Sequence, residues 1–419
     1  MPAGSTGKES DKLRVVAFDP YAPVIPLRWL RKVRPATLLM LFPAVAVILY
    51  AGAAAGGMAG GSGDFRWAED IRRALGDDDL KPTEAFTYPL VRDAIDWLLA
   101  AAMVVELMIM RRQWSLFANG LPRLVRNGVL RPASGQLHDL FEHRQLPKWL
   151  ATIPPEDRLF AYVDRVNSRN RRRAPIYTWL YAFTALVSAA LLVSVERYRL
   201  FRILVPKGAS LHEQEEWRRN VYQHWWASIH HPSGVATYFL LAAIVIYIVA
   251  AQTHIGVQAA QIAAALPWLV DVDANWINPD GEYGWRPVRQ IFRTVWLSMA
   301  LYGLVVSALA LVLGLGSVGW IPATIWVLLL IIYVAVPWIA MGKIEEVAKE
   351  NRIATAQTEI MAVTTKEQDD LETRVRKYRE VRIRLMRLGR FERIPVALSV
   401  FLPVVLNLVQ PYIQTYLFK

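Results

Sequence analysis

The stretch GVATYFLLAAIVIYIVAAQTH, residues 234–254, is predominantly apolar and contains no Asp, Glu, Lys or Arg. About 20 apolar residues in a helix cross the roughly 30 Å hydrocarbon layer of a bilayer. Such a run has to be helical in lipid, because only a helix satisfies its own backbone hydrogen-bonding groups there. The stretch therefore predicts a membrane-spanning helix.

Six further runs of similar length predict a polytopic, all-α transmembrane bundle of about seven spans. These runs are residues 35–56, 88–110, 176–195, 292–314, 319–341 and 394–416. The composition agrees, because 54% of the 419 residues are hydrophobic and only 20% are charged, which is too apolar for several soluble domains.

The runs divide the chain into six parts with different expected environments. They are a cytoplasmic N-terminal segment (1–34), spans 1 and 2 (35–110), a basic cytoplasmic loop (111–175), spans 3 to 6 (176–341), a cytoplasmic helical hairpin (342–393) and span 7 (394–419). The hairpin is expected because Thr364 and Glu367 have the spacing of a capping box at the start of its second helix.

The distribution of basic residues predicts the orientation. With the N-terminus inside, the inner segments hold 35 Lys and Arg residues and the outer loops hold 10. Basic residues accumulate in cytoplasmic loops, so we expect a cytoplasmic N-terminus and, with an odd number of spans, an outer C-terminus. The mildly acidic segment 255–290 on the inner side is the exception. The same asymmetry accounts for the net charge of +12 without a nucleic-acid partner.

Two features of the composition bear on the compartment. The chain has no cysteine, which excludes disulfides, thiolate metal sites and a cysteine nucleophile. The first 33 residues are mixed and polar, so no cleavable signal peptide is expected. The excess of Arg over Lys and the abundance of Ala indicate a GC-rich bacterial genome and hence the plasma (inner) membrane.

The C-terminal stretch VALSVFLPVVLNLVQPYIQTYLFK, residues 396–419, carries a polar stripe on one helical face. The stripe consists of Ser399, Pro403, Asn407, Gln410 and Gln414. An amide that faces lipid costs several kcal/mol, so the stripe should face protein or water. Two interpretations remain open: the helix forms the wall of a water-lined pathway, or its amides hydrogen-bond to other helices in a packed bundle.

The second predicted span contains three ionisable residues within about 80° of one another, Arg92, Asp96 and Glu106. Arg92 and Asp96 have the spacing of an i,i+4 ion pair. Ionisable groups inside a span are taken as functional by default. Alternatively, the helix begins near Asp96, the charges before it lie among the outer headgroups, and Glu106 extends towards the inner surface near Arg111.

Three further groups are candidates for ligand binding. In DVDANWINPDGE, Asp271, Asp273, Asn275 and Glu282 occupy positions 1, 3, 5 and 12 of an EF-hand pattern, so a divalent cation is the one cofactor that the sequence suggests. Trp276 stands where that pattern needs Gly, and a simple turn is the alternative. Arg171, Arg172 and Arg173 precede the third span and are expected to contact anionic lipid headgroups. His224, His230 and His231 show no metalloenzyme spacing.

These observations favour a membrane conduit, a channel before a transporter, with the last helix lining its pathway. The first alternative is a membrane-anchored sensor or scaffold that acts through its cytosolic helical segments, and the second is a membrane-embedded enzyme. The expected partners are the bilayer, anionic headgroups and further copies of the chain. The order of segments resembles the layout of insect-chemoreceptor-like channels, a resemblance that covers no motif and transfers no residue role.

Overall fold

The computed structural model describes residues 13–75, 87–132, 147–204, 210–272 and 284–313, together with Thr324 and Leu328. This part of the chain is mostly helical, as the sequence predicts. Its α-helices are α1 (Pro35–Leu39), α2 (Leu41–Ala55), α3 (Trp67–Leu75), α4 (Ala94–Arg126), α5 (Lys148–Ala151), α6 (Pro155–Leu204), α7 (Leu211–Asn220), α8 (Pro232–Leu269) and α9 (Arg286–Leu313). Short 3₁₀ helices are η1 (Ile25–Arg31), η2 (Ser62–Asp64), η3 (Leu90–Arg92) and η5 (Val221–His224).

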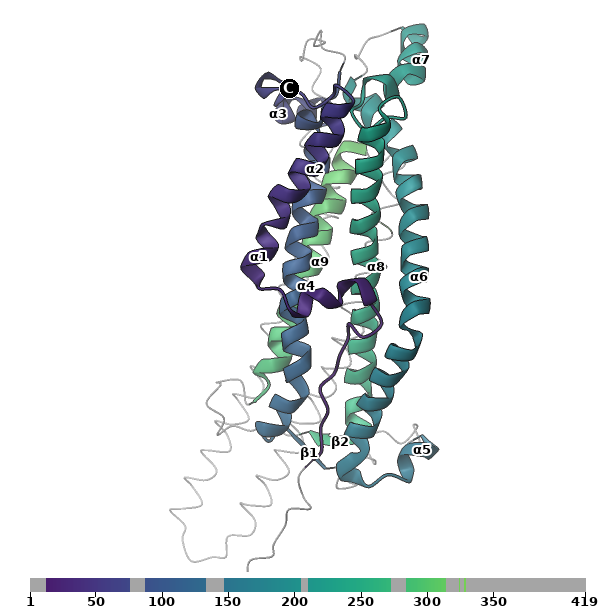
Figure 1. Ribbon diagram of the computed structural model, residues 1–419. Helices are drawn as coiled ribbons and strands as arrows, with labels where there is room; N and C mark the ends of the chain where they lie inside the picture. Colours follow the sequence, from purple (N-terminus) through teal and green to yellow (C-terminus); the bar gives the residue numbers. More distant parts are fainter. Residues whose placement is uncertain are drawn as a thin grey trace, which may run out of the picture.

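The long helices form an elongated bundle in which α2, α4, α6, α8 and α9 run roughly side by side (Figure 1). Helix α6 packs along α8, and α4 packs against α9, α8, α2 and α1. Helix α4 is therefore an interior helix, and this explains why so many of its side chains are buried.

A small sheet closes one end of the bundle. Strand β1 (Leu130–Pro132) follows α4 and pairs antiparallel with β2 (Val270–Val272), which follows α8, with Leu130 opposite Val272. We call this end the sheet end and the opposite end, which carries α3 and α7, the α7 end (Figure 1). Strands β1 and β2 belong to the basic segment 111–175 and the acidic segment 255–290, so the described parts of these two segments meet at the same end, as the predicted orientation requires.

Three helices are long and apolar enough to cross a membrane, judged by length and composition. They extend over Pro35–Ala55, Pro155–Glu196 and Pro232–Leu266, and they contain the first, third and fourth predicted spans. The second and fifth predicted spans coincide largely with α4 and α9, which are not in this group. Seven spans are not confirmed. Apart from Thr324 and Leu328, the sixth span, the hairpin 342–393, the seventh span and its stripe of Ser399, Asn407, Gln410 and Gln414 lie outside the described residues.

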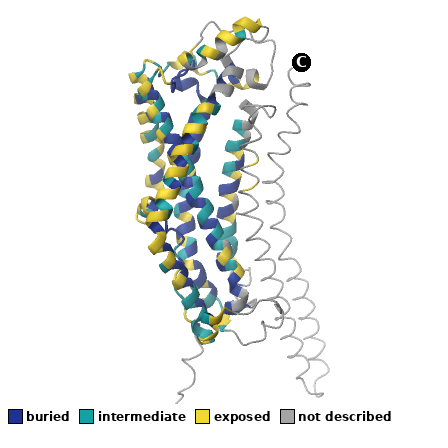
Figure 2. Cartoon of the chain, turned by 90° about the vertical axis from the view of Figure 1, so that its right-hand side faces the viewer, coloured by how far each residue is buried: buried dark blue, intermediate teal, exposed yellow. Residues whose placement is uncertain are grey.

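The helices extend well past the apolar runs. Residues 111–126 continue α4, and residues 155–175 form the first part of α6, both within the segment 111–175 that we expected to be cytoplasmic. On α6 the exposed apolar residues begin at Ile176, and the segment before it contains Arg171, Arg172 and Arg173. The hydropathy pattern therefore identifies only the apolar part of each helix, which is shorter than the helix itself. Figure 2 shows exposed residues on the outward faces and buried ones inside.

The N-terminal residues 13–24 pack against the part of the bundle near the sheet end. The Arg14 amide donates to the Glu156 carbonyl (3.1 Å), and the Asp19 amide donates to Asn167 Oδ1 (3.1 Å). Asn167 Nδ2 returns a hydrogen bond to the Ala17 carbonyl (2.9 Å). Helix η1 follows and contacts both α4 and α6. The N-terminal segment therefore covers part of the apolar surface of these helices near the sheet end.

Small residues bring α6 and α8 close together. Ala189 on α6 is fully buried and packs against Ala242 and Ala243 on α8, and Ala185 is also buried. A small residue lets two helix backbones approach, which is how helices associate in a membrane without a hydrophobic driving force. Ala185 and Ala189 are four residues apart, so they lie on the same face of α6.

Candidate functional site

Three buried polar residues lie along the interior side of α4, and we call Asp96, Glu106 and Gln113 the α4 polar column. Their exposed fractions are 0%, 2% and 0%. At 1.5 Å rise per residue, Glu106 lies about 15 Å from Asp96 and about 10 Å from Gln113 along the helix axis. Between them the helix buries apolar side chains such as Met103 and Met110. The column therefore places a carboxyl group deep within the helical bundle.

Glu106 is paired with a hydroxyl group of α9. Ser298 is fully buried, and its hydroxyl donates a hydrogen bond of 2.7 Å to Glu106 Oε1. The other carboxylate oxygen, Oε2, is buried and makes no hydrogen bond of normal geometry among the described residues, although the Tyr302 hydroxyl of α9 also interacts with this carboxylate. None of the ion pairs within the described ranges involves Glu106. A carboxyl group in this position needs a proton, a cation or water to complete its interactions.

Gln113 lies at the centre of the next polar group. Its Oε1 atom accepts hydrogen bonds from Gln252 Nε2 on α8 (2.6 Å) and from the Tyr21 hydroxyl (3.4 Å). The Tyr21 hydroxyl also donates to the Met110 carbonyl (2.7 Å), so the N-terminal segment is fixed to α4 here. Gln113 Nε2 and Gln252 Oε1 are buried and lack partners within the described chain. This group therefore retains a free donor and a free acceptor inside the bundle.

A third polar group joins α6 to α8 nearer the sheet end. Asn170 and Gln258 exchange two hydrogen bonds of 2.8 Å each through their side-chain amides. Gln258 Nε2 also contacts the His254 ring, which packs 4.6 Å from the Tyr177 ring centroid. These amides satisfy each other, so the group stabilises the α6–α8 contact and resembles a structural element more than a site.

Tryptophans and acidic residues close the α7 end. Trp225 Nε1 donates to Asp93 Oδ2 (3.0 Å), and Trp226 Nε1 donates to Asp96 Oδ2 (3.1 Å) and to Asp93 Oδ2 (3.3 Å). Tyr88 joins the two loops, since its amide donates to the His224 carbonyl (2.6 Å) and its carbonyl accepts from the Trp226 amide (3.1 Å). Asp96 thus stands at the head of the column beneath a layer of indole rings.

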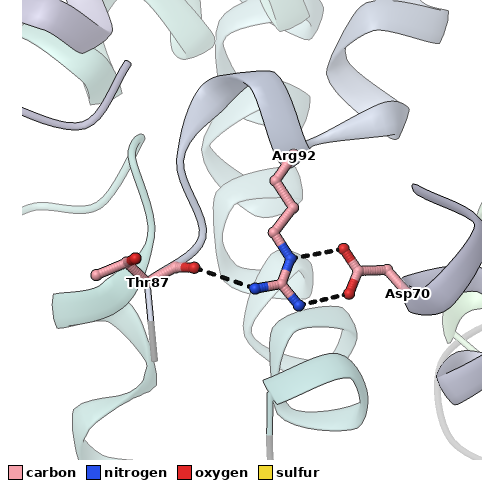
Figure 3. A network of polar contacts seen from close by, with 3 residues as sticks. All are labelled: Asp70, Thr87 and Arg92. Atoms are coloured by element: carbon pink, nitrogen blue, oxygen red, sulfur yellow. Dashed lines mark hydrogen bonds and ion pairs between the residues drawn. The ribbon is translucent and has the colours of Figure 1, made fainter. Parts of the chain in front are cut away.

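Arg92 has a different partner from the one that we expected. It lies in η3, before α4 begins at Ala94, and it is 2% exposed. Its Nε and Nη2 atoms donate to the two carboxylate oxygens of Asp70 at 2.7 and 2.6 Å, and Nη1 donates to the Thr87 carbonyl at 3.3 Å (Figure 3). The i,i+4 pair with Asp96 is therefore wrong, because Arg92 is not on the helix. Burial lowers the pKa of Arg92, but the hydrogen bonds and charge of Asp70 outweigh it and raise the pKa overall.

The remaining candidates are separate from the column. Arg171, Arg172 and Arg173 are exposed on α6. Asp271 lies in β2 opposite Arg131, whereas Asp273, Asn275 and Glu282 are outside the described residues, so the calcium pattern stays a prediction. Within the described ranges, no group of three or more His, Asp and Glu residues could hold a metal ion.

Sequence reasoning found Asp96 and Glu106 but missed Ser298, Gln113 and Gln252. Glu106 was recognisable because a carboxylate within an apolar run is rare. Ser298 and the glutamines are ordinary in helices, and only the packing of α4 against α8 and α9 brings them together. No protein-family profile, curated protein or solved structure matches the chain.

Proposed function

We propose that this chain is a multi-pass membrane protein that conducts small cations, protons included, along the α4 polar column. The observation that carries the proposal is Glu106, whose carboxyl group is buried between α4 and α9 against the hydroxyls of Ser298 and Tyr302, without an ion-pair partner among the described residues. Ionisable groups at membrane depth mark ion pathways and proton relays more often than structural contacts.

The polar residues on either side of Glu106 along α4 favour a continuous ion pathway over a single isolated buried carboxyl group. The free atoms of Gln113 and Gln252 lie towards the sheet end, and Asp96 lies towards the α7 end. Buried polar atoms without protein partners usually bind ordered water. The polar groups of the column are separated by about 10–15 Å along α4. A few hydrogen-bonded water molecules between Asp96, Glu106 and Gln113 would bridge these distances.

The surface of the bundle agrees with a membrane setting. The exposed apolar residues of α6 are Ile176, Trp179, Leu180, Phe183, Leu186, Val187 and Leu191, and they face away from the column. Apolar residues outside and polar ones inside are the arrangement that a lipid solvent requires. In this proposal α4 and α9 are spans as well, the N-terminus is cytoplasmic, and residues 394–416 complete the wall with Asn407 and Gln410.

The alternative function, a sensor or scaffold, depends on residues 342–393, which lie outside the described ranges. A membrane enzyme would need a reactive cluster, and the described chain brings His224, His230 and His231 into no metal-binding group. Neither alternative explains why a carboxyl group is buried against Ser298. The conduit is therefore the function that the geometry supports best.

Ion flux from reconstituted liposomes tests the proposal. The vesicles contain a pH dye and carry a potassium gradient. After valinomycin is added, their internal pH should change only when they contain the protein. The variant Glu106→Gln keeps the shape of the side chain but removes its charge, so we expect proton flux to fall at least about tenfold. Matched vesicles with sodium and potassium indicators measure the other cations.

Glu216→Gln is the matched control, because it makes the same change from a carboxylate to an amide at an exposed position of α7. It should conduct like the wild-type protein. Absence of proton, sodium and potassium flux above protein-free vesicles would overturn the conduit. Wild-type flux with an unchanged Glu106→Gln variant would instead show that ions pass elsewhere than along the column.

A further inference from the structure

A basic groove runs along the first half of α6, and the N-terminal segment contacts it through Arg14, whose guanidinium lies 4.4 Å from the Phe160 ring centroid. The groove has a volume of about 610 Å³ and is lined by Phe160, Asp164, Arg165, Arg169, Arg172 and Arg173, together with small residues. Four guanidinium groups oppose a single carboxylate, so the groove attracts an anion with more than one negative charge.

The groove continues upwards into an apolar surface. At 100° per residue, Arg165, Arg169 and Arg172 lie on the same side of α6 as Ile176, Trp179 and Phe183, within an arc of about 80°. The exposed fractions of the last three are 66%, 76% and 67%. One continuous stripe therefore changes from arginine to large apolar side chains within a single helical turn, between Arg172 and Ile176.

From this stripe we propose that α6 binds an anionic phospholipid with two phosphate groups, of the diphosphatidylglycerol class. The phosphates would lie against Arg169, Arg172 and Arg173, and the acyl chains would lie along Ile176 and Trp179. Guanidinium groups bind phosphate oxygens in a planar, two-point geometry that lysine does not provide. Basic pockets beside spans on the cytoplasmic side bind lipids of this kind.

The number of arginines left for the headgroup decides between one phosphate and two. Arg169 and Arg173 lie about 6 Å apart along the helix with Arg172 between them, and three positive charges are more than one phosphate group neutralises. Arg165 is already engaged, because its guanidinium lies 4.3 Å from the Trp149 ring centroid, so it closes the far end of the groove. This leaves Arg169, Arg172 and Arg173 for the headgroup.

The same geometry assigns a different position to Arg171. It does not line the groove, and its charge acts on Asp19 of the N-terminal segment together with Arg31 and Arg28. Of the three consecutive arginines, we therefore expect Arg172 and Arg173 to bind the lipid and Arg171 to stabilise the fold. This prediction distinguishes a specific binding site from the general electrostatic attraction of a run of arginines to an anionic membrane.

Native mass spectrometry of the purified full-length protein, titrated with tetraoleoyl-diphosphatidylglycerol or dioleoyl-phosphatidylcholine, tests the proposal. We expect the two-phosphate lipid to be retained in preference to phosphatidylcholine. The double variant R169Q/R172Q should weaken its binding roughly ten- to thirtyfold, since each basic residue near the surface contributes about one factor of five. R34Q/R171Q is the matched control with the same loss of charge, and its affinity should stay within about twofold.

Two further arms keep the result decisive. W179A changes only an exposed side chain of the apolar half, so it should weaken lipid binding without affecting folding. Inorganic pyrophosphate at millimolar concentration should displace little lipid, because it makes no acyl contacts. The proposal is overturned if R34Q/R171Q weakens binding as much as R169Q/R172Q, or if phosphatidylcholine binds equally well. It is also overturned if pyrophosphate displaces the lipid and W179A changes nothing, because the ligand would then be a soluble phosphate.

Discussion

Arg92 and Asp70 form a two-point ion pair at the α7 end of the bundle, with Nε–Oδ2 and Nη2–Oδ1 distances of 2.7 and 2.6 Å. The side chains are only 2% and 5% exposed. The pair joins α3 to the turn before α4, and the Trp67 indole donates to the Val91 carbonyl (2.7 Å) beside it. Helix α3 and the turn η3, whose paired residues are 22 positions apart, are thereby held together at the head of the α4 polar column.

Breaking this ion pair should destabilise the fold strongly. Asp70→Asn leaves a buried guanidinium without its counter-charge, and removal of one partner of a buried pair costs about 3–5 kcal/mol. Arg92→Gln should cost a similar amount, and the double variant should cost clearly less than the sum of the two. Tryptophan fluorescence during thermal unfolding in detergent measures this, because the chain has 16 tryptophans. Strictly additive effects would contradict the coupling.

A second prediction concerns Gly234 in the first turn of α8. A Cβ atom at this position would lie 1.9 Å from the Trp226 carbonyl oxygen, a backbone atom that cannot move alone. Gly234→Ala should therefore separate α8 from the Trp225–Trp226 loop and destabilise the protein by about 2 kcal/mol or more.

Gly63→Ala is the control for this substitution, since nothing lies within 4 Å of the corresponding Cβ position. Its unfolding temperature should differ little from that of the wild-type protein. The tryptophan emission spectrum should shift only in the Gly234 variant, because Trp226 loses its buried environment. Equal unfolding temperatures for the two variants would show that the loop adapts without cost.

The sequence predicted the position of the apolar helical runs better than the ends of the helices. The run 35–56 coincides with α1 and α2, and 176–195 and 234–254 lie inside α6 and α8. Hydropathy could not predict that α4 continues to Arg126 or that α6 begins at Pro155. Those parts are amphipathic, and their buried residues, such as Leu159 and Val163, are covered by tertiary contacts.

The polar site was predictable only in part for a related reason. Glu106 is conspicuous among apolar neighbours, but its partner Ser298 is 192 residues away in the chain. Arg92 was assigned to the wrong partner because spacing within a helix was assumed where the chain forms η3. Pairing of Leu130 with Val272 was also missed, since three-residue strands leave almost no periodic signal.

A third prediction tests the wall that the last apolar run is proposed to supply. The chain has no cysteine, so single cysteines can be introduced without altering other positions. In reconstituted vesicles, cysteines at Asn407 and Gln410 should react with a membrane-impermeant thiol reagent, whereas cysteines at Val405 and Leu408 should not. Reaction at none of the four positions would mean that the stripe packs dry against other helices, and reaction at all four would mean that the segment is not embedded.

The fourth prediction concerns Asp19 and the pH dependence of stability. Burial raises the pKa of Asp19 above its usual value of 3.8, and the nearby charge of Arg31, the Tyr21 amide and the charges of Arg171 and Arg28 offset this only in part. The folded state therefore binds this proton more tightly than the unfolded chain. The unfolding free energy should fall as the pH rises above about 4, and level off once the pH exceeds the pKa in the folded state.

Asp19→Asn removes this titration but keeps an oxygen that accepts from the Tyr21 amide. We expect the unfolding temperature of Asp19→Asn, relative to the wild-type protein, to be higher at pH 7 than at pH 4. Asp157→Asn, at a partly exposed site where the carboxylate lies 3.8 Å from Arg14 Nη1, is the control for the loss of a carboxylate near arginine. A difference that grows towards acidic pH would mean that the three arginines stabilise the Asp19 carboxylate more than burial destabilises it, and that the N-terminal segment is held by ion pairing.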